Sequence, residues 1–312
     1  MQYIWKGCLA ILEYRNHSMN LIKFINEEIM KNLQTIVIYV LDRNIISIIK
    51  DKNANKSITD KNKQNILDYL NRINCSKSIV TPILSLLEGQ HGRIECADEI
   101  SDTVNKELEA LGNFFGRKKV DRSLIENKDF FSLFKIAKTS NEYHENIKAK
   151  INFLKDINEY LYQPLSTRAR SDARDKVMSI QREKYGKYFD NFNPIVIAAL
   201  CSIYDNDVCK KILKPKKYIN NTNYYNAVMD FQYFNLFVYI FGRMEGRYNK
   251  KYNAKNRLVF LSGDKNLNEF FSWYDVCHSK SSLVNGVFKS KMKLSETGVS
   301  NIPDELRKLL NI

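Results

Sequence analysis

The sequence predicts an α/β fold in which a central, mostly parallel sheet is flanked by helices and an α-helical subdomain is inserted into the chain. Two short runs rich in β-branched residues, TIVIYVL at 35–41 and RLVFL at 257–261, have the continuous apolar character of strands covered on both faces. The segments between these runs show helical periodicity, and the segment 129–193 carries charged residues throughout. Strands that alternate with helices indicate a parallel sheet.

The first part of the chain predicts a helical arm, a strand and two helices. Residues 1–34 carry apolar positions at mixed helical spacing, which indicates one or two short helices. The strand at 35–41 ends at Asp42, and NIISIIK then begins a helix. After a polar, turn-rich stretch, the periodicity around 65–73 predicts an amphipathic helix.

A second strand and two further helices are expected next. SIVT at 78–81 favours a strand that leads into the helix carrying Glu88, because Pro82 is tolerated in the first turn of a helix. Apolar residues at helical spacing over 97–115 predict a helix that closes at Gly116.

The stretch 129–193 predicts a helical insertion with three candidate helices, FFSLFKIAK, ENIKAKINFLKDINEYLY and SDARDKVMSIQREKYGKYF. The dipeptide Asn193-Pro194 marks its end. Residues 221–243 then predict a long helix with dense aromatic side chains, which we interpret as core. The expected organisation is an N-terminal helical arm at 1–34, the first part of the α/β domain at 35–128, the insertion at 129–193, the second part of the α/β domain at 194–285 and a C-terminal tail at 286–312.

Composition favours a polyanionic partner. The 312 residues include 49 Lys and Arg against 35 Asp and Glu, a net charge of +14, and the clustering of the basic residues favours a nucleic acid. The six cysteines show no CxxC pair and no zinc-ligand spacing, so neither a disulfide framework nor a zinc site is indicated, and we expect a cytoplasmic protein. No stretch approaches the roughly twenty apolar residues of a membrane helix, and no membrane association is expected.

Four acidic residues stand where a metal-dependent phosphodiesterase would need them. Asp42 and Asp264 follow predicted strands, and sites in open α/β sheets form at the carboxyl ends of strands. Glu88 and Asp230 lie in predicted helices. Mg²⁺ and Mn²⁺ prefer oxygen ligands, and crowded carboxylates are unfavourable without a cation. The set therefore suggests a metal-dependent nuclease.

The four segments resemble, in order, the motifs of the PIN family of ribonucleases. VLDRN resembles the turn with the family's first acid, which is followed two residues later by a small polar residue, here Asn44. SLLEG and YYNAVMDFQYF resemble the helices of the second and third acids. LVFLSGDKNL resembles the last strand, with Ser262 two positions before the fourth acid. The resemblance covers about 36–120 and 195–280, and the long segment between the second and third acids departs from compact members.

This resemblance implies a PIN-like fold and a metal-dependent endoribonuclease that uses Mg²⁺ or Mn²⁺. Relatives of this type are often toxins or defence effectors, which implies a protein partner that inhibits or activates the enzyme. Asn44 and Ser262 are expected to orient these carboxylates. The catalytic and metal-binding residues that the resemblance implies are Asp42, Glu88, Asp230 and Asp264.

Each acid also has a structural alternative. Asp42 and Asp264 could cap the helices that follow them, and Glu88 could lie on the solvated edge of its helix. Asp230 is harder to explain in this way, because a carboxylate in an apolar, aromatic-rich segment must lie near solvent, be paired or bind a metal.

A basic segment, RYNKKYNAKNR at 247–257, precedes the last strand. Its cations suit phosphates and its tyrosines suit stacking on bases of a single strand. KKILKPKK at 210–217 and GRKKVDR at 116–122 could extend this track, or all three could be solvated lysine-rich surface. Arg170 and Arg174 could clamp substrate or pair with neighbouring acids, and we favour pairing. The residues expected to bind nucleic acid are Arg247, Lys250, Lys251, Lys255, Arg257 and Lys265.

Three functions are consistent with these patterns. The first is a metal-dependent endoribonuclease that acts on RNA. The second is a non-catalytic adaptor that binds RNA or a protein through its basic faces and the helical insertion. The third is a DNA nuclease or phosphatase that uses the same acidic cluster.

Overall fold

The structure is a computed structural model of the chain. It describes residues 36–76, 78–89, 92–121, 138–218, 220–232, 256–276, 282–284, 287–289 and 292–312. The expected N-terminal arm, most of the FFSLFKIAK segment and residues 233–255 lie outside the described residues.

A three-stranded parallel sheet forms the centre of the fold. β1 (Ile36–Leu41) lies in the middle and pairs with β2 (Ser78–Thr81) on one side and β3 (Asn256–Leu261) on the other. Val40 stands opposite Thr81 and Phe260, so the carboxyl ends of the strands reach one edge together. The described part is otherwise mostly helical, which confirms the α/β prediction in its general form.

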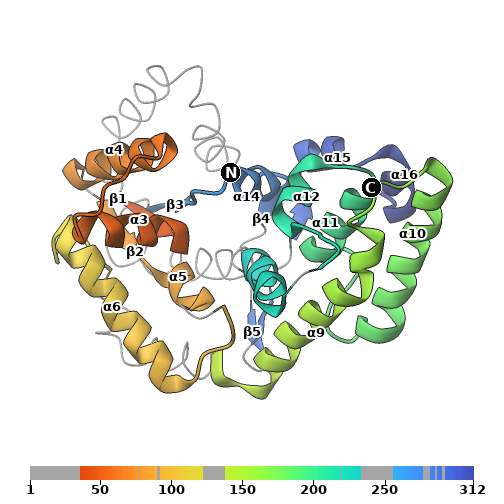
Figure 1. Cartoon of the computed structure of the whole chain (residues 1–312), viewed down its shortest axis with the longest axis horizontal. Coiled ribbons are helices and arrows are strands. Elements are labelled where there is room, and N and C mark those ends of the chain that lie inside the picture. The colour runs from red at the N-terminus through yellow and green to blue at the C-terminus, as the bar shows by residue number, and fades with distance from the viewer. Residues whose placement is uncertain are drawn as a thin grey trace.

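Helices surround this sheet. Figure 1 shows the sheet with α3, α4 and α6 at one end of the molecule and α10 and α16 at the other. In chain order, the helices are α3 (Arg43–Asn53), α4 (Lys61–Cys75), α5 (Ile83–Glu88), α6 (Ala97–Phe115), α9 (Asn141–Ile157), α10 (Thr167–Ile180), α11 (Pro194–Ile203), α12 (Asp207–Leu213), α14 (Lys265–Phe271), α15 (Glu296–Asn301) and α16 (Asp304–Leu310). A 3₁₀ turn at Asn158–Tyr160 follows α9, a π-helical segment at Gln181–Tyr185 follows α10, and residues 221–232 are helical.

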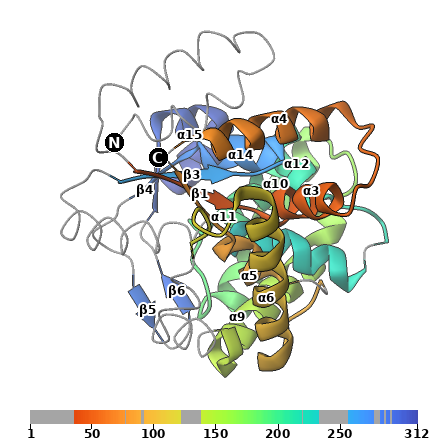
Figure 2. The ribbon, with the colours of Figure 1, turned by 90° about the vertical axis from the view of Figure 1, so that its left-hand side faces the viewer.

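The alternation of side chains along β1 divides the core between the two faces of the sheet. Val37, Tyr39 and Leu41 pack with α3 and α4 on one face. Ile38 and Val40 pack on the other face with α5, α9 and α11. Figure 2 shows α4 and α9 on opposite sides of the sheet. Because both faces are covered, β1 can be apolar along its whole length.

The helical insertion shares the core of the sheet. Ile147 and Phe153 of α9 and Val177 of α10 belong to the same apolar cluster as Ile38 and Val40. Two of the three helices expected in the insertion correspond to α9 and α10, and the third falls mainly outside the described residues. The insertion is therefore packed onto the α/β part rather than built around a separate core.

The segment expected to be a C-terminal tail is also built into the core. Ile302, Leu306 and Leu310 are buried in the large cluster. Short strands precede α15 and α16, and they pair antiparallel as β4 (Tyr274–Val276) with β7 (Met292–Leu294) and as β5 (Ser282–Val284) with β6 (Val287–Lys289). Gly298 lies so close to the backbone of Trp273 that a Cβ built on it would be 2.8 Å from the Trp273 carbonyl carbon.

Candidate functional site

Two predicted site residues meet at the carboxyl edge of the sheet. The backbone N–H of Asp42, just after β1, donates to the Leu261 carbonyl at 3.1 Å. Ser262, just after β3, donates its hydroxyl to the Asp42 carboxylate. The backbone N–H of Asp264 donates to Ser262 Oγ at 3.0 Å. Ser262 thus links Asp42 to the loop of Asp264 through two hydrogen bonds.

Asp42 is buried, with 2% of its surface exposed. Burial raises the pKa of Asp42 to about 6, although hydrogen bonds from Ser262 and from the backbone of Ile45 and Gly263 act in the opposite direction. The negative charge of Asp264 raises this pKa further. In the metal-free protein, ionisation of Asp42 therefore costs more free energy than in water, and the carboxylate takes up its proton at a higher pH than an ordinary aspartate.

Both strand-end acids cap helices, as their structural alternative predicts. Asp42 Oδ1 accepts from the backbone N–H of Ile45 at 2.9 Å, at the start of α3. Asp264 Oδ1 accepts from Asn266 and Leu267 at 2.8 and 3.1 Å, at the start of α14. Within the described part of the chain, the second oxygen of Asp264 makes no hydrogen bond. Capping therefore occupies Oδ1 of Asp264 and leaves Oδ2 for a ligand.

Among the four acids, Asp230 has the environment least favourable for a charged carboxylate. It lies in the helical residues 221–232, between Met229 and Phe231, which are buried. Burial raises the pKa of Asp230 well above its ordinary value, and the charges of Glu88, Asp264 and Asp42 raise it further, in that order. The four acids predicted from the sequence are thus close enough to act on one another through their charges.

These acids fit a divalent cation chemically, but they are not gathered around one point. Their carboxylate oxygens are the ligands that Mg²⁺ and Mn²⁺ prefer. Mutual repulsion among anions keeps such groups apart, and a cation would relieve it. Among the described residues, no three His, Cys, Asp or Glu side chains lie close enough to hold a metal ion together.

The other residues predicted for the site differ in their positions, and only some of them are described. Asn44 is exposed and makes no hydrogen bond to the four acids within the described part of the chain; its Cβ lies 3.6 Å from a Cβ built on Gly263. Lys265 is exposed at the first position of α14, next to Asp264. The strand β3 includes Arg257, but nothing is described of its side chain. Outside the described residues lie Arg247, Lys250, Lys251 and Lys255.

Several basic side chains have structural partners. Lys119 of the GRKKVDR stretch donates to the carbonyl of Ser76 at 2.6 Å, at the end of α4. The pairing interpretation is confirmed for Arg170, which bonds Asp205, and for Arg174, which lies 2.7 Å from Asp175. In the KKILKPKK stretch, Lys214 is exposed, and its charge lowers the pKa of Asp230.

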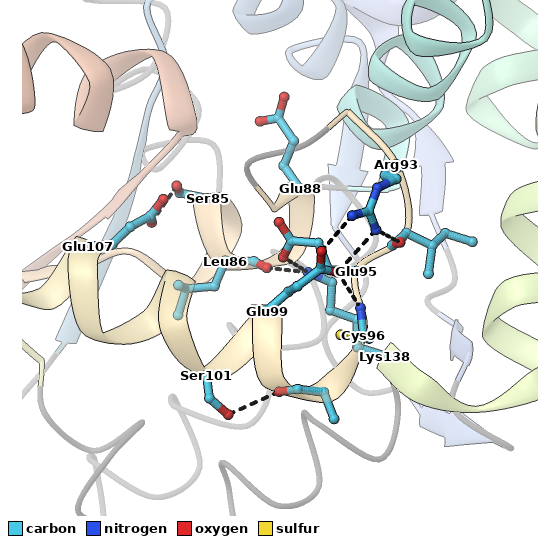
Figure 3. Close-up of polar contacts among 12 residues, drawn as sticks. Ser85, Leu86, Glu88, Arg93, Glu95, Cys96, Glu99, Ser101, Glu107 and Lys138 are labelled. Carbon is cyan, nitrogen blue, oxygen red and sulfur yellow. Dashed lines mark hydrogen bonds and ion pairs between the residues drawn. The ribbon is translucent and has the colours of Figure 1, made fainter.

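The residues that hold the helix of Glu88 are not among those predicted from the sequence. Figure 3 shows the Glu88 carboxylate pointing away from a buried polar network on the other side of α5. There, Ser85 donates to Glu107 at 2.5 Å and Lys138 donates to the Leu86 carbonyl at 2.7 Å. Nothing in the sequence distinguishes Lys138 or Glu107 from ordinary surface charges, because their partners are distant along the chain.

Arg43 is also absent from the residues predicted for the site. It directly follows Asp42 in the first turn of α3. Its Nη1 is buried, and no hydrogen-bond partner for it is present among the described residues. Its charge lowers the pKa of Glu107 and of Tyr225, so the guanidinium lies within electrostatic range of both residues. A buried N–H without an acceptor is unfavourable, and an anionic ligand would satisfy it.

Comparisons with known protein families, with curated proteins and with solved structures find no match for this chain. Within the described residues, no helix combines the length and the apolar character needed to cross a membrane.

Proposed function

We propose that this protein is a metal-dependent endoribonuclease with a PIN-like site at the carboxyl edge of the sheet. The observation that carries the proposal is Asp230, whose pKa is raised by burial and by the charges of the three other predicted acids. Carboxylates that repel one another are unfavourable for stability, and groups with strongly shifted pKa values gather at functional sites. The order of the acids along the chain matches the motifs that the sequence resembles.

The residues divide the expected tasks among them. Asp42, Glu88, Asp230 and Asp264 would hold Mg²⁺ or Mn²⁺, which would supply an activated water and offset the charge that develops on the phosphate. Ser262 orients Asp42 by a hydrogen bond. Arg43 and Lys214 bring positive charge close to the acids and would bind phosphate oxygens of the substrate. The predicted protein partner and the role in toxicity or defence belong to this proposal.

The direct test is cleavage of RNA in the presence of Mg²⁺ or Mn²⁺. We expect Asp230→Asn and Asp264→Asn each to lower kcat about 100-fold or more, because each removes a ligand of a cation that contributes several kcal/mol to catalysis. Asp68→Asn, at an exposed position of α4, removes the same charge elsewhere and should leave kcat unchanged.

Each alternative function predicts its own result in that assay. Equal cleavage by all variants would mean that the activity arises at another site. Cleavage of single-stranded DNA but not RNA would assign a DNA nuclease, and hydrolysis of a phosphomonoester alone would assign a phosphatase. Absence of any hydrolysis would favour the non-catalytic adaptor.

Lys214 provides a separate test of the path of the substrate. It adopts the left-handed conformation, with φ of 50°, at the end of α12. We expect Lys214→Gln to raise KM for RNA several-fold with little change in kcat, because it removes one phosphate contact beside the acids. The slope of log affinity against log salt should fall by about 0.7, the value for one phosphate contact of a single strand. Lys148→Gln, at an exposed position of α9, should change neither quantity.

A further inference from the structure

α5 is too short to hold its own end in place, yet it carries Glu88 as its last residue. It has six residues, and the final carbonyls of a helix have no partners within the helix. In α5, Gly89 donates its N–H to the Ser85 carbonyl at 3.1 Å. Lys138 Nζ donates to the Leu86 carbonyl at 2.7 Å, and the Tyr225 hydroxyl donates to the Glu88 carbonyl at 2.9 Å. Two of these three donors come from side chains far away in the sequence.

Lys138 makes its bond from a fully buried position. Its side chain is 1% exposed and pairs with Glu95, which is 0% exposed, at 3.4 Å between Nζ and Oε2. Burial lowers the pKa of Lys138, and the charge of Glu95 opposes this effect. Replacing a buried ion pair by well-packed apolar residues is often neutral for stability, so the contacts that this pair makes matter more here than its contribution to stability.

Glu95 also packs against Gly89, the residue that follows α5. Gly89, the residue after Glu88, has φ of +76°. A Cβ built on Gly89 would lie 2.6 Å from both carboxylate oxygens of Glu95. The backbone that leaves α5 is thus packed directly on the anion that Lys138 binds, and Figure 3 shows Glu95 and Lys138 together beneath α5. The ion pair holds both the last turn of the helix and the residue that follows it.

We propose that the Lys138–Glu95 pair is a positioning device that fixes the Glu88 carboxylate toward the other three acids, and that it couples the helical insertion to the site. This inference rests on the proposed function of those acids. Lys138 belongs to the insertion, and its own carbonyl lies 3.0 Å from Nε2 of His144 on α9. A displacement of α9 would therefore shift Lys138, and the bond from Lys138 to the Leu86 carbonyl would transmit that shift to the helix that ends at Glu88.

The test replaces both charges at once. Lys138→Met alone would leave Glu95 buried without its cation and could unfold the protein, whereas Lys138→Met/Glu95→Gln keeps the volumes and removes the bond to Leu86. Arg93→Gln/Glu99→Gln is the matched control, because it removes an ion pair of 2.5 Å from the neighbouring surface, where Arg93 is 56% exposed. Hydrogen–deuterium exchange of peptides covering residues 83–95 and an electron paramagnetic resonance titration with Mn²⁺ are measured on the full chain.

We expect the buried double variant to exchange faster over 83–95 and to bind Mn²⁺ about tenfold more weakly, the range seen when groups that orient metal ligands are lost. The surface double variant should match the wild type in both measurements. Tyr225→Phe removes only the bond to the Glu88 carbonyl and should give a smaller change in the same direction.

Unchanged exchange over 83–95 in the buried double variant would overturn the inference. So would faster exchange with unchanged Mn²⁺ affinity, because the pair would then hold the helix without setting the site. If the wild type itself binds no Mn²⁺, the proposed function fails, and the part of the inference that concerns Glu88 as a ligand fails with it. Exchange would in that case still decide whether the pair fixes α5.

Discussion

Asp42→Asn should stabilise the metal-free protein at pH 7.5 while it abolishes metal-dependent activity. Asparagine caps helices as well as aspartate does, so the bond to Ile45 at the start of α3 can be kept. The change removes a carboxylate whose pKa burial raises from 3.8 to about 6. A shift of that size corresponds to about 3 kcal/mol of unfavourable free energy when the group is ionised.

The stability gained by Asp42→Asn relative to the wild type should depend on pH. The pKa of Asp42 is higher in the folded than in the unfolded protein, so the penalty of the wild type is fully present above pH 6. It declines as the pH falls from about 6 toward 3.8, because the folded protein then binds the proton first. Thermal unfolding of wild type and variant at several pH values, with a metal chelator present, should show a difference in Tm of about 5 °C at pH 7.5.

A helix cap without a buried charge provides the control for this comparison. Asp60 caps α4 by accepting from Asn62 and Lys63, and its side chain is exposed. Asp60→Asn should therefore leave Tm nearly unchanged at every pH. If Asp42→Asn also leaves Tm unchanged, Asp42 is an ordinary cap, and the metal interpretation of this residue loses its support. Added Mn²⁺ should raise Tm of the wild type and of Asp60→Asn but not of Asp42→Asn.

Gly298→Ala should be the most destabilising single methyl addition among the described glycines. A Cβ at this position would overlap the backbone of Trp273, with its carbonyl carbon at 2.8 Å and its Cα at 3.0 Å. A backbone cannot turn away as a side chain can, so α15 must move off the core. We expect an increase in the free energy of the folded state of about 3 kcal/mol or more, in the range of severe overpacking. Urea unfolding monitored by tryptophan fluorescence would measure it.

Gly112→Ala is the matched control. Gly112 lies inside α6, and a Cβ there would meet Arg117 Cγ at 3.6 Å, an ordinary contact. Alanine is the better helix former, so this change should stabilise by about 0.5–1 kcal/mol. A mild effect of Gly298→Ala would indicate that α15 and α16 can separate from the core without unfolding it, as a true tail would.

The parts of the fold that depend on local patterns could be predicted from the sequence. β1 and β3 are short apolar runs, and the helix α6 shows its period and its closing glycine, so their positions agree with the structure. The C-terminal segment could not be recognised as core, because its strands and helices are short and each buries only a few residues. Leu306 and Leu310 become core residues only through partners that are distant along the chain.

The same distinction between local patterns and distant contacts applies to the candidate site. Asp42 and Asp264 could be located because a strand end is a local feature, and Asp230 because a carboxylate in an apolar helix is conspicuous. The contacts of Lys138 with Leu86 and Glu95 span 52 and 43 residues. No local pattern carries such information, and a lysine near apolar residues is an ordinary helix component until its partner is known. The supporting residues of a site are therefore the hardest to find from one sequence.

The hydrogen bond between Ser262 and Asp42 determines when, during synthesis, the two strand ends can first be joined. The two residues are 220 positions apart, and β1 cannot pair with β3 until the intervening chain has been made. At about 5–20 residues per second, Asp42 is added to the growing chain at least about 10 s before Ser262. Closing so long a loop is also slow relative to local helix formation. During synthesis, the early helices therefore have time to form before the hydrogen bond between Ser262 and Asp42 can join the two strand ends.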